Sequence, residues 1–147
     1  MPGFRLKLPQ VQDELAERVR NELPEGLAFD IGYPDRGPAS EHVWIDGAFD
    51  TDLTNDVSGG QVRDEDGKVR FVISITASRG PMTTLRDRAL ELEGCIEDAI
   101  ADDPTLGDLV QQAWVSKVSG LYALPDKART YYTTVDVSYA VAVSSSG

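Results

Sequence analysis

Residues 83–118 carry the strongest periodic pattern of the chain. Apolar side chains recur there at steps of three and four residues, which places them on one stripe of a helix: Leu85, Ala89, Leu92, Ile96, Ala99 and Ile100. Thr84 is a suitable N-cap, and the Asp87 carboxylate suits the positive end of the helix dipole. The helix should end at Asp103, because a residue before a proline disfavours the α conformation. We expect an amphipathic helix over residues 84–102, with the rest of the chain arranged around it.

A second helix is expected near the N-terminus. Val11, Leu15, Val19 and Leu23 recur every four residues after Pro9, and the helix should stop at Pro24. Residues 1–8 alternate only weakly and predict a short arm or strand. Residues 144–147 are small and polar, which predicts a flexible tail.

Alternation of apolar and polar residues predicts five strands. They cover residues 27–31, 42–45, 69–77, 114–118 and 131–143. A short helical turn is expected at residues 109–113, and a loop at residues 120–127. Short connections between neighbouring strands favour antiparallel pairing.

These elements predict an α+β fold in a single domain of residues 1–147. The sheet should be mostly antiparallel, or mixed, with the two main helices packed on one face. A length of 147 residues and a hydrophobic content of 41% suit one domain with one core.

Residues 46–68 interrupt the pattern with a long polar segment. Its carboxylates are Asp46, Asp50, Asp52, Asp56, Asp64, Glu65 and Asp66. Gly59-Gly60 and Asp66-Gly67 are turn signals. We expect a long acidic loop or hairpin excursion, and excursions of this length in compact domains are usually functional or disordered.

The charge balance of the chain argues against some classes of binding partner. The chain has 14 basic and 25 acidic residues, for a net charge of −11. This balance opposes a large phosphate-binding surface and docking on an anionic membrane. We expect neither a signal peptide nor a membrane span, since no run approaches the roughly 20 apolar residues that a spanning helix needs. The single cysteine, Cys95, excludes an internal disulfide and is interpreted as a small buried hydrophobe.

A search for catalytic chemistry is mostly negative. The one histidine, His42, has no nucleophile turn to serve and is interpreted as an ordinary residue at a strand edge. Phosphate-loop and dinucleotide fingerprints are absent from the sequence. Asp50-Thr51-Asp52 begins like a calcium loop, but Thr54 and Asn55 stand where a ligand and a glycine are needed. We therefore predict no catalytic residue, metal site or cofactor.

Two other features favour assembly with other chains. The acidic excursion is long, and apolar or aromatic residues fall in segments predicted as loops. These residues are the candidate subunit or partner contacts: Leu53, Val57, Leu121, Tyr122 and Leu124. Together with the long terminal strand, they could join subunits by edge pairing.

The ordered set of elements resembles the tail terminator family of long-tailed bacteriophages, including tail-completion and tail-to-head joining proteins. The resemblance rests on the first helix, the strand at residues 69–77, and the second helix followed by D-P-T-L-G-D-L-V at residues 103–110. The terminal strand YYTTVDVSYAV also fits. The resemblance covers about residues 10–143.

Such proteins form a hexameric ring on the last ring of the tail tube, stop its polymerisation and present a surface for head joining. The resemblance implies a homohexameric virion protein at the head–tail junction, assembled in the host cytoplasm. Its partners would be the tail tube protein and a head completion or connector protein, with no membrane. DNA would pass through the lumen without being specifically bound.

The acidic excursion would then line or enter that lumen. The candidate lumen-facing residues are Asp50, Asp52, Asp56, Asp64, Glu65 and Asp66. Three alternatives stay open at this point: another head–tail connector or minor tail protein, a small metal-carboxylate enzyme, and a monomeric binding module.

Overall fold

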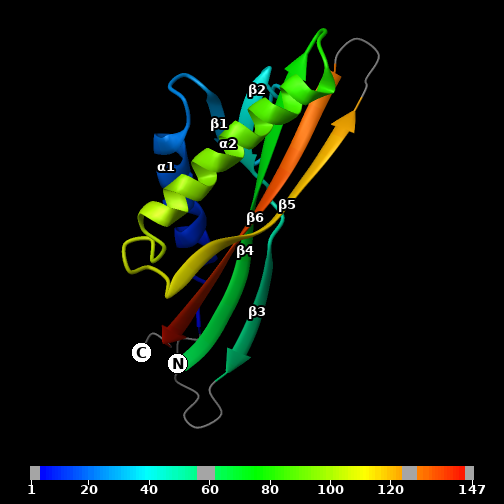
Figure 1. Cartoon of the computed structure of the whole chain (residues 1–147). Coiled ribbons are helices and arrows are strands. Elements are labelled where there is room, and N and C mark those ends of the chain that lie inside the picture. The colour runs from blue at the N-terminus through cyan, green and yellow to red at the C-terminus, as the bar shows by residue number, and fades with distance from the viewer. Residues whose placement is uncertain (1–3, 56–61, 124–128, 145–147) are drawn as a thin grey trace.

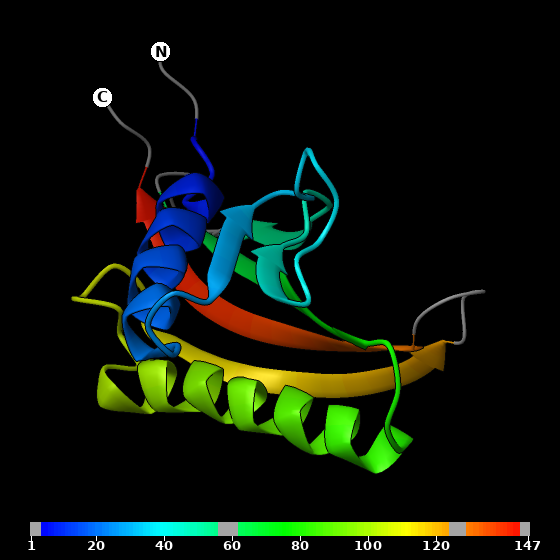
Figure 2. The same cartoon turned by 90° about the horizontal axis from the view of Figure 1, so that it is seen from above.

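The computed structural model describes residues 4–55, 62–123 and 129–144. Two helices, α1 (Leu8–Glu22) and α2 (Met82–Asp102), lie on one face of a six-stranded sheet (Figures 1 and 2). The strands are β1 (Ala28–Ile31), β2 (Glu41–Ile45), β3 (Asp50–Asn55), β4 (Val62–Ala77), β5 (Gln112–Ala123) and β6 (Arg129–Ser144). The predicted α+β fold, with its two helices on one face, is confirmed.

The sheet is built around two long central strands. Its order is β1-β2-β4-β6-β5, and β4 and β6 pair antiparallel over all 16 residues of each. Since β6 occupies one side of β4, β2 and β3 share the other side, with β2 on the second half of β4 and β3 on the first. β1 and β2 run parallel, joined by residues 32–40, so the sheet is mixed.

The helices cover the sheet with the stripes that the sequence predicts. The stripe of α2 is buried, and so is that of α1 with Val11, Leu15 and Val19. They pack on the odd-numbered side chains of β4 and β6, such as Phe71 and Val137, which are fully buried. The opposite face carries the even-numbered side chains of β4 and β6 and has no helix on it in the described residues; the β1–β2 connection covers only its β2 end, where Tyr33 packs on Trp44. We call this opposite face the open face.

Two local predictions around α2 are wrong. The helix begins at Met82, after an extended Pro81, so Thr84 lies inside the first turn, where its backbone N–H donates to the Pro81 carbonyl. The expected helical turn at residues 109–113 does not form. Just before this segment, Leu106, Gly107 and Asp108 adopt positive φ, which keeps the chain from entering a right-handed helix there, and β5 already starts at Gln112.

Strand lengths also differ from the predictions. β4 starts at Val62 rather than Val69, so residues 46–68 include a β3–β4 hairpin, one of the two forms expected. β5 runs to Ala123, which places Leu121 and Tyr122 in a strand and not in a loop. The added parts of β4 and β5 carry many polar side chains, so their sequences lack a clear apolar–polar alternation. Their strand conformation becomes evident only from their pairing with β6.

A glycine allows an aromatic ring to close the core at the β3–β4 hairpin. Gly67 is directly opposite Tyr139 in the register, and the fully buried Tyr139 ring lies over the Gly67 Cα. Any Cβ at residue 67 would overlap that ring. The strand therefore needs glycine here for space and not for an unusual φ angle.

We predict that Gly67→Ala lowers the free energy of unfolding by about 1–3 kcal/mol, because the added methyl displaces a buried ring. Gly47→Ala is the matched control, since a Cβ at residue 47 meets open space. The control should stay within about 0.5 kcal/mol of the parent protein. Urea denaturation measures both values, and equal stabilities would contradict this account of Gly67.

Candidate functional site

The open face carries a charged row across its central strands. Lys117 of β5 is opposite Asp136 of β6, and Asp136 is opposite Arg70 of β4. The Asp136 carboxylate is almost buried and accepts hydrogen bonds from Arg70 Nε at 2.8 Å and from a terminal nitrogen at 3.3 Å. This contact raises the pKa of Arg70. The pair fixes both side chains on the sheet and leaves Lys117 exposed.

Four of the predicted acidic residues project from the open face at the β3–β4 hairpin. Asp50 is opposite Lys68, and Asp52 is directly opposite Asp66, with Asp64 one row further along. All four carboxylates are exposed. Like charges directly opposite each other destabilise a sheet. The Asp52–Asp66 pair therefore concentrates negative charge on the open face and does not stabilise the fold.

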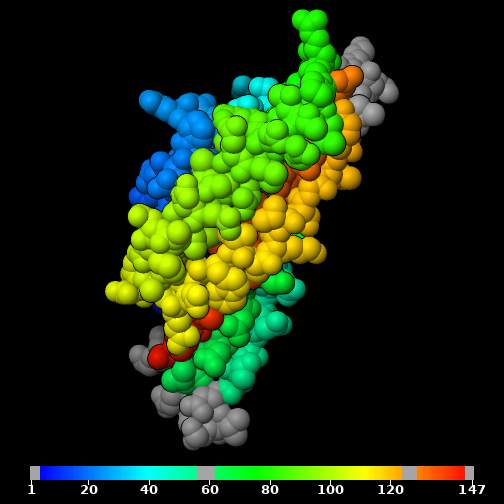
Figure 3. All heavy atoms as spheres, in the orientation of Figure 1, coloured from blue at the N-terminus to red at the C-terminus, as the bar shows by residue number. Residues whose placement is uncertain are grey.

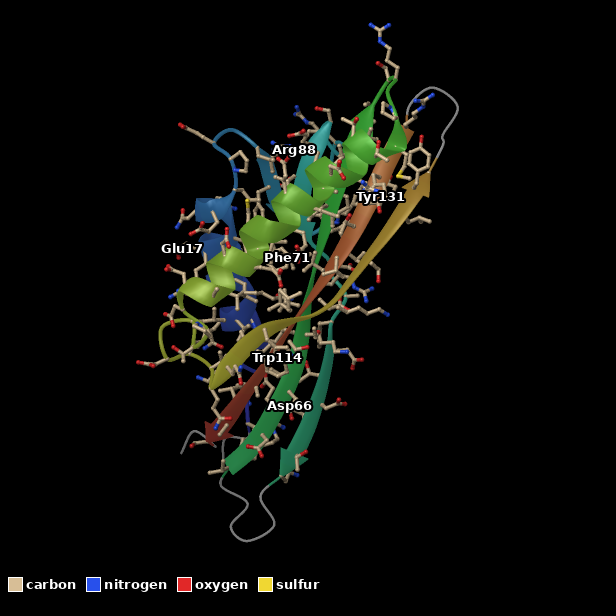
Figure 4. The ribbon with its side chains drawn as sticks, in the orientation of Figure 1. Glu17, Asp66, Phe71, Arg88, Trp114 and Tyr131 are labelled. Carbon is tan, nitrogen blue, oxygen red and sulfur yellow. The ribbon has the colours of Figure 1, made fainter. Side chains whose placement is uncertain are left out.

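The hairpin also borders a shallow hollow of about 280 Å³ on the open face. Asp50, Asp52 and Asp66 line it from one side, and Trp114 of β5 lines it from the other. Figure 4 shows Trp114 and Asp66 near each other on the part of the sheet that extends beyond the helices. An aromatic side chain, 40% exposed, thus lies beside a group of carboxylates.

Glu65 does not belong to this exposed set. Its side chain points to the helix side of the sheet, where it is fully buried. Glu65 Oε2 accepts a hydrogen bond from the Tyr139 hydroxyl at 2.6 Å, and Oε1 accepts one from the Lys7 backbone N–H at 2.9 Å. Burial and the neighbouring Glu65 raise the pKa of Tyr139. The expectation that Glu65 faces a lumen is wrong, because strand alternation turns it inward between Asp64 and Asp66.

The N-terminal arm is held by this same buried group. Besides the Lys7–Glu65 hydrogen bond, the Arg63 guanidinium lies 4.6 Å from the centre of the Phe4 ring. Phe4 and Leu6 are partly buried against the core. Residues 4–7 therefore cover the helix side of the hairpin where the two helices do not reach it.

The predicted contact residues lie on two different strands. Leu53 of β3 is 46% exposed and Leu121 of β5 is 66% exposed, whereas Tyr122 is half-buried. Asp56, Val57 and Leu124 lie outside the described residues. Sequence reasoning missed Trp114 and Val118 of β5 as exposed groups. Their exposure follows from the position of β5 at the margin of the sheet, which the sequence pattern does not indicate.

His42 has a structural role that the sequence only partly indicates. It lies on β2, between β1 and β4, and is buried rather than at a strand edge. Its Nδ1 accepts the Ala39 N–H at 2.9 Å, so Nε2 carries the proton that it donates to Asp30 Oδ2 at 2.7 Å. These two bonds anchor the connection between the parallel strands.

The segment that is most specific for the sequence resemblance forms a hydrogen-bonded turn. Asp103 Oδ1 accepts hydrogen bonds from the Thr105 hydroxyl and N–H, and Oδ2 accepts one from the Gly107 N–H at 2.8 Å. Arg18 of α1 lies 3.3 Å from the same oxygen. The Thr105 and Gly107 bonds lower the pKa of Asp103. This segment thus joins the end of α2 to α1 and directs the chain into β5.

Among residues 4–55, 62–123 and 129–144, no group of three or more metal-ligating side chains is assembled. In the same described part of the chain, neither helix is long and apolar enough to cross a membrane. Burial, followed by the nearby Asp98, raises the pKa of the Cys95 thiol, and the side chain is half-buried on α2.

Comparisons with known proteins give little further guidance. No family model and no curated protein matches this sequence. Among solved structures, a chain described as "Virion of native gene transfer agent (GTA) particle" is similar with a TM-score of 0.40 and 13% identity. The match covers 88% of this chain and 94% of that chain.

We predict that Asp103→Ala destabilises the protein at pH 7 and that the loss shrinks in acid. Since folding lowers the Asp103 pKa from its ordinary value of 3.8, its stabilising effect is present above that pH and disappears as the pH falls through the folded-state pKa. Urea denaturation at pH 7 and below pH 3.8 tests this. Asp102→Ala, an exposed neighbour, is the control and should show no such pH-dependent difference. A loss that is equal at both pH values would contradict the prediction.

Proposed function

We propose that this chain is a structural protein of a phage-like virion that acts by assembling into a closed ring. The observation that carries the proposal is that the two faces of the sheet differ. One face of the sheet is covered by helices, while the other has no helix on it and carries the exposed carboxylates and the Arg70–Asp136 pair. The β3–β4 hairpin extends past the helices (Figure 3). If such subunits close into a ring with the sheet along its wall, the open face lines the lumen and the helix face forms the outer wall.

Within that class, we propose the particular role of tail terminator. The support is the resemblance of the sequence, from the first helix to the terminal strand, to that family. Six copies would close on the last ring of the tail tube, with one surface matching the tube protein. The opposite surface would not template another tube ring and would instead meet a head completion or connector protein. The role is geometric, with no catalytic step and no cofactor.

The exposed carboxylates of the hairpin suit a lumen through which DNA passes. Asp50, Asp52, Asp64 and Asp66 all project from the open face. If this face lines the channel, the carboxylates repel the phosphates of the passing DNA. The net charge of −11 has the same sign. DNA would therefore traverse the ring without specific binding.

Mass photometry with and without purified tail tubes tests the proposal. Rings of six copies, alone or at tube ends, are the expected result. A monomer that ignores tubes would overturn the terminator role and favour the monomeric binding module. Rings that bind the head connector but leave tube length unchanged would move the protein to a neighbouring connector position.

We predict that reversing the lumen charge impairs DNA passage without affecting assembly. In the variant Asp64→Lys/Asp66→Lys, one of the two introduced lysines would be opposite Asp52, and both would attract passing phosphates. The control is Asp13→Lys/Glu17→Lys, which changes the net charge equally on the exposed side of α1. Rings should form in both variants, while infectivity in a complementation assay falls only in the first. Unchanged infectivity would sink the idea that this face lines the channel.

A further inference from the structure

β5 presents a long free edge at the margin of the sheet. In the part of the chain that the structure describes, β5 pairs with β6 on one side and with no strand on the other. Only the start of this outer edge is occupied, because the Ala113 N–H donates to the Pro104 carbonyl at 2.8 Å. Over 12 residues it carries a single charge, that of Lys117, and it contains no proline. Natural proteins usually protect such edges with several charges, prolines or a covering element. β5 has only a bulge between Val115 and Lys117.

The side chains of β5 also favour contact with another chain. Trp114 is 40% exposed, Val118 43% and Leu121 66%. Trp114 and Leu121 are opposite Ser138 and Tyr132 on the open face, whereas Val118 is opposite Val135 on the helix side. Apolar groups therefore flank the free backbone edge on both faces. Figure 3 shows β5 uncovered along the flank of α2.

A second free edge lies across the sheet on β3. In the described part of the chain, β3 pairs only with β4, so its outer edge is unpaired. Asp50 and Asp52 project from the open face at this edge, and the 46% exposed Leu53 projects from the helix side. β3 and β5 thus lie on opposite margins of the β4–β6 pair (Figure 1).

The two edges are complementary in charge and in apolar character. Lys117 projects from the open face, as Asp50 and Asp52 do. Val118 projects from the helix side, as Leu53 does. β1 is a poorer match, because it has four residues and its one charge, Asp30, is already bonded to His42.

We propose that the β5 edge of one copy pairs with the β3 edge of the next copy, so that the sheets continue from subunit to subunit. This inference rests on the proposed ring and identifies its contact surfaces. The contact is heterologous, joining unlike patches, and such contacts generate rings when the rotation closes. Lys117 of one subunit pairs with Asp50 and Asp52 of the next. Leu53 packs beside Val118 on the helix side.

Complementary charge reversals test the pairing. Lys117→Glu alone and Asp52→Lys alone should each raise the protein concentration needed for rings by about tenfold or more, because every contact in the ring then joins like charges. An equal mixture should restore assembly. In an alternating ring, the introduced glutamate of one variant meets the introduced lysine of the other, and the intervening contacts keep the original Lys117 and Asp52.

Arg79→Glu is the matched control, since it changes the net charge as Lys117→Glu does, but at an exposed turn after β4. It should assemble like the parent protein. Mass photometry of each variant and of the mixture gives the measurement, with circular dichroism to confirm folding. Rings that persist in both single variants, or a mixture that fails to recover, would overturn the pairing while leaving the ring proposal intact.

Cross-linking gives a second test that does not depend on charge. In a Cys95→Ser background, Ser119→Cys marks β5 and Thr54→Cys marks β3, both at exposed positions. A short bis-maleimide should join the two variants to each other in mixed rings, but not a Glu91→Cys control on α2. Homodimers of Ser119→Cys alone would indicate β5–β5 pairing and overturn the inference. If the parent protein forms no ring, with or without tubes, both proposals fail.

Discussion

The full-length pairing of β4 with β6 is the interaction on which the rest of the structure depends. It runs from the Val62–Ser144 pair to the Ala77–Arg129 pair, and every other strand attaches to one of the two strands directly or through β2. α2 and β5 lie between β4 and β6 in the chain, so this contact closes a long segment before the sheet can form. The molecule owes its elongated outline to this pair (Figure 1).

The central pair is longer than the helix layer that covers it, and the uncovered part needs another way to exclude water. At the hairpin, the Tyr139 ring lies over Gly67 and its hydroxyl bonds to the buried Glu65. The arm donates the Lys7 N–H to the same carboxylate and places Phe4 under Arg63. A buried carboxylate is costly unless it is hydrogen-bonded, so these elements stabilise the hairpin only as a group. The exposed carboxylates of the β3–β4 hairpin are therefore held in place by the hydrogen bonds to Glu65 on the other face.

The helices, their common face and most strands could be predicted because their signal is local. A stripe such as Leu85, Ala89 and Leu92 needs no knowledge of its partner. The order of the strands depends on contacts distant in sequence, and that order decides which strand is free. The terminal strand, expected to offer an edge, lies between β4 and β5, and β5 takes the margin. The prediction for Glu65 is wrong for a related reason: in a run of acidic residues, only the strand register distinguishes the one carboxylate that points inward.

Charge sets the remaining constraint on assembly. A net charge of −11 on each copy opposes association at long range, more strongly at low ionic strength. Any attraction between copies must therefore come from short-range contacts. The exposed edges offer unpaired backbone groups, the single cation Lys117 and four apolar side chains, those of Leu53, Trp114, Val118 and Leu121. Such a contact is weak between free copies and becomes effective when a template holds the copies side by side.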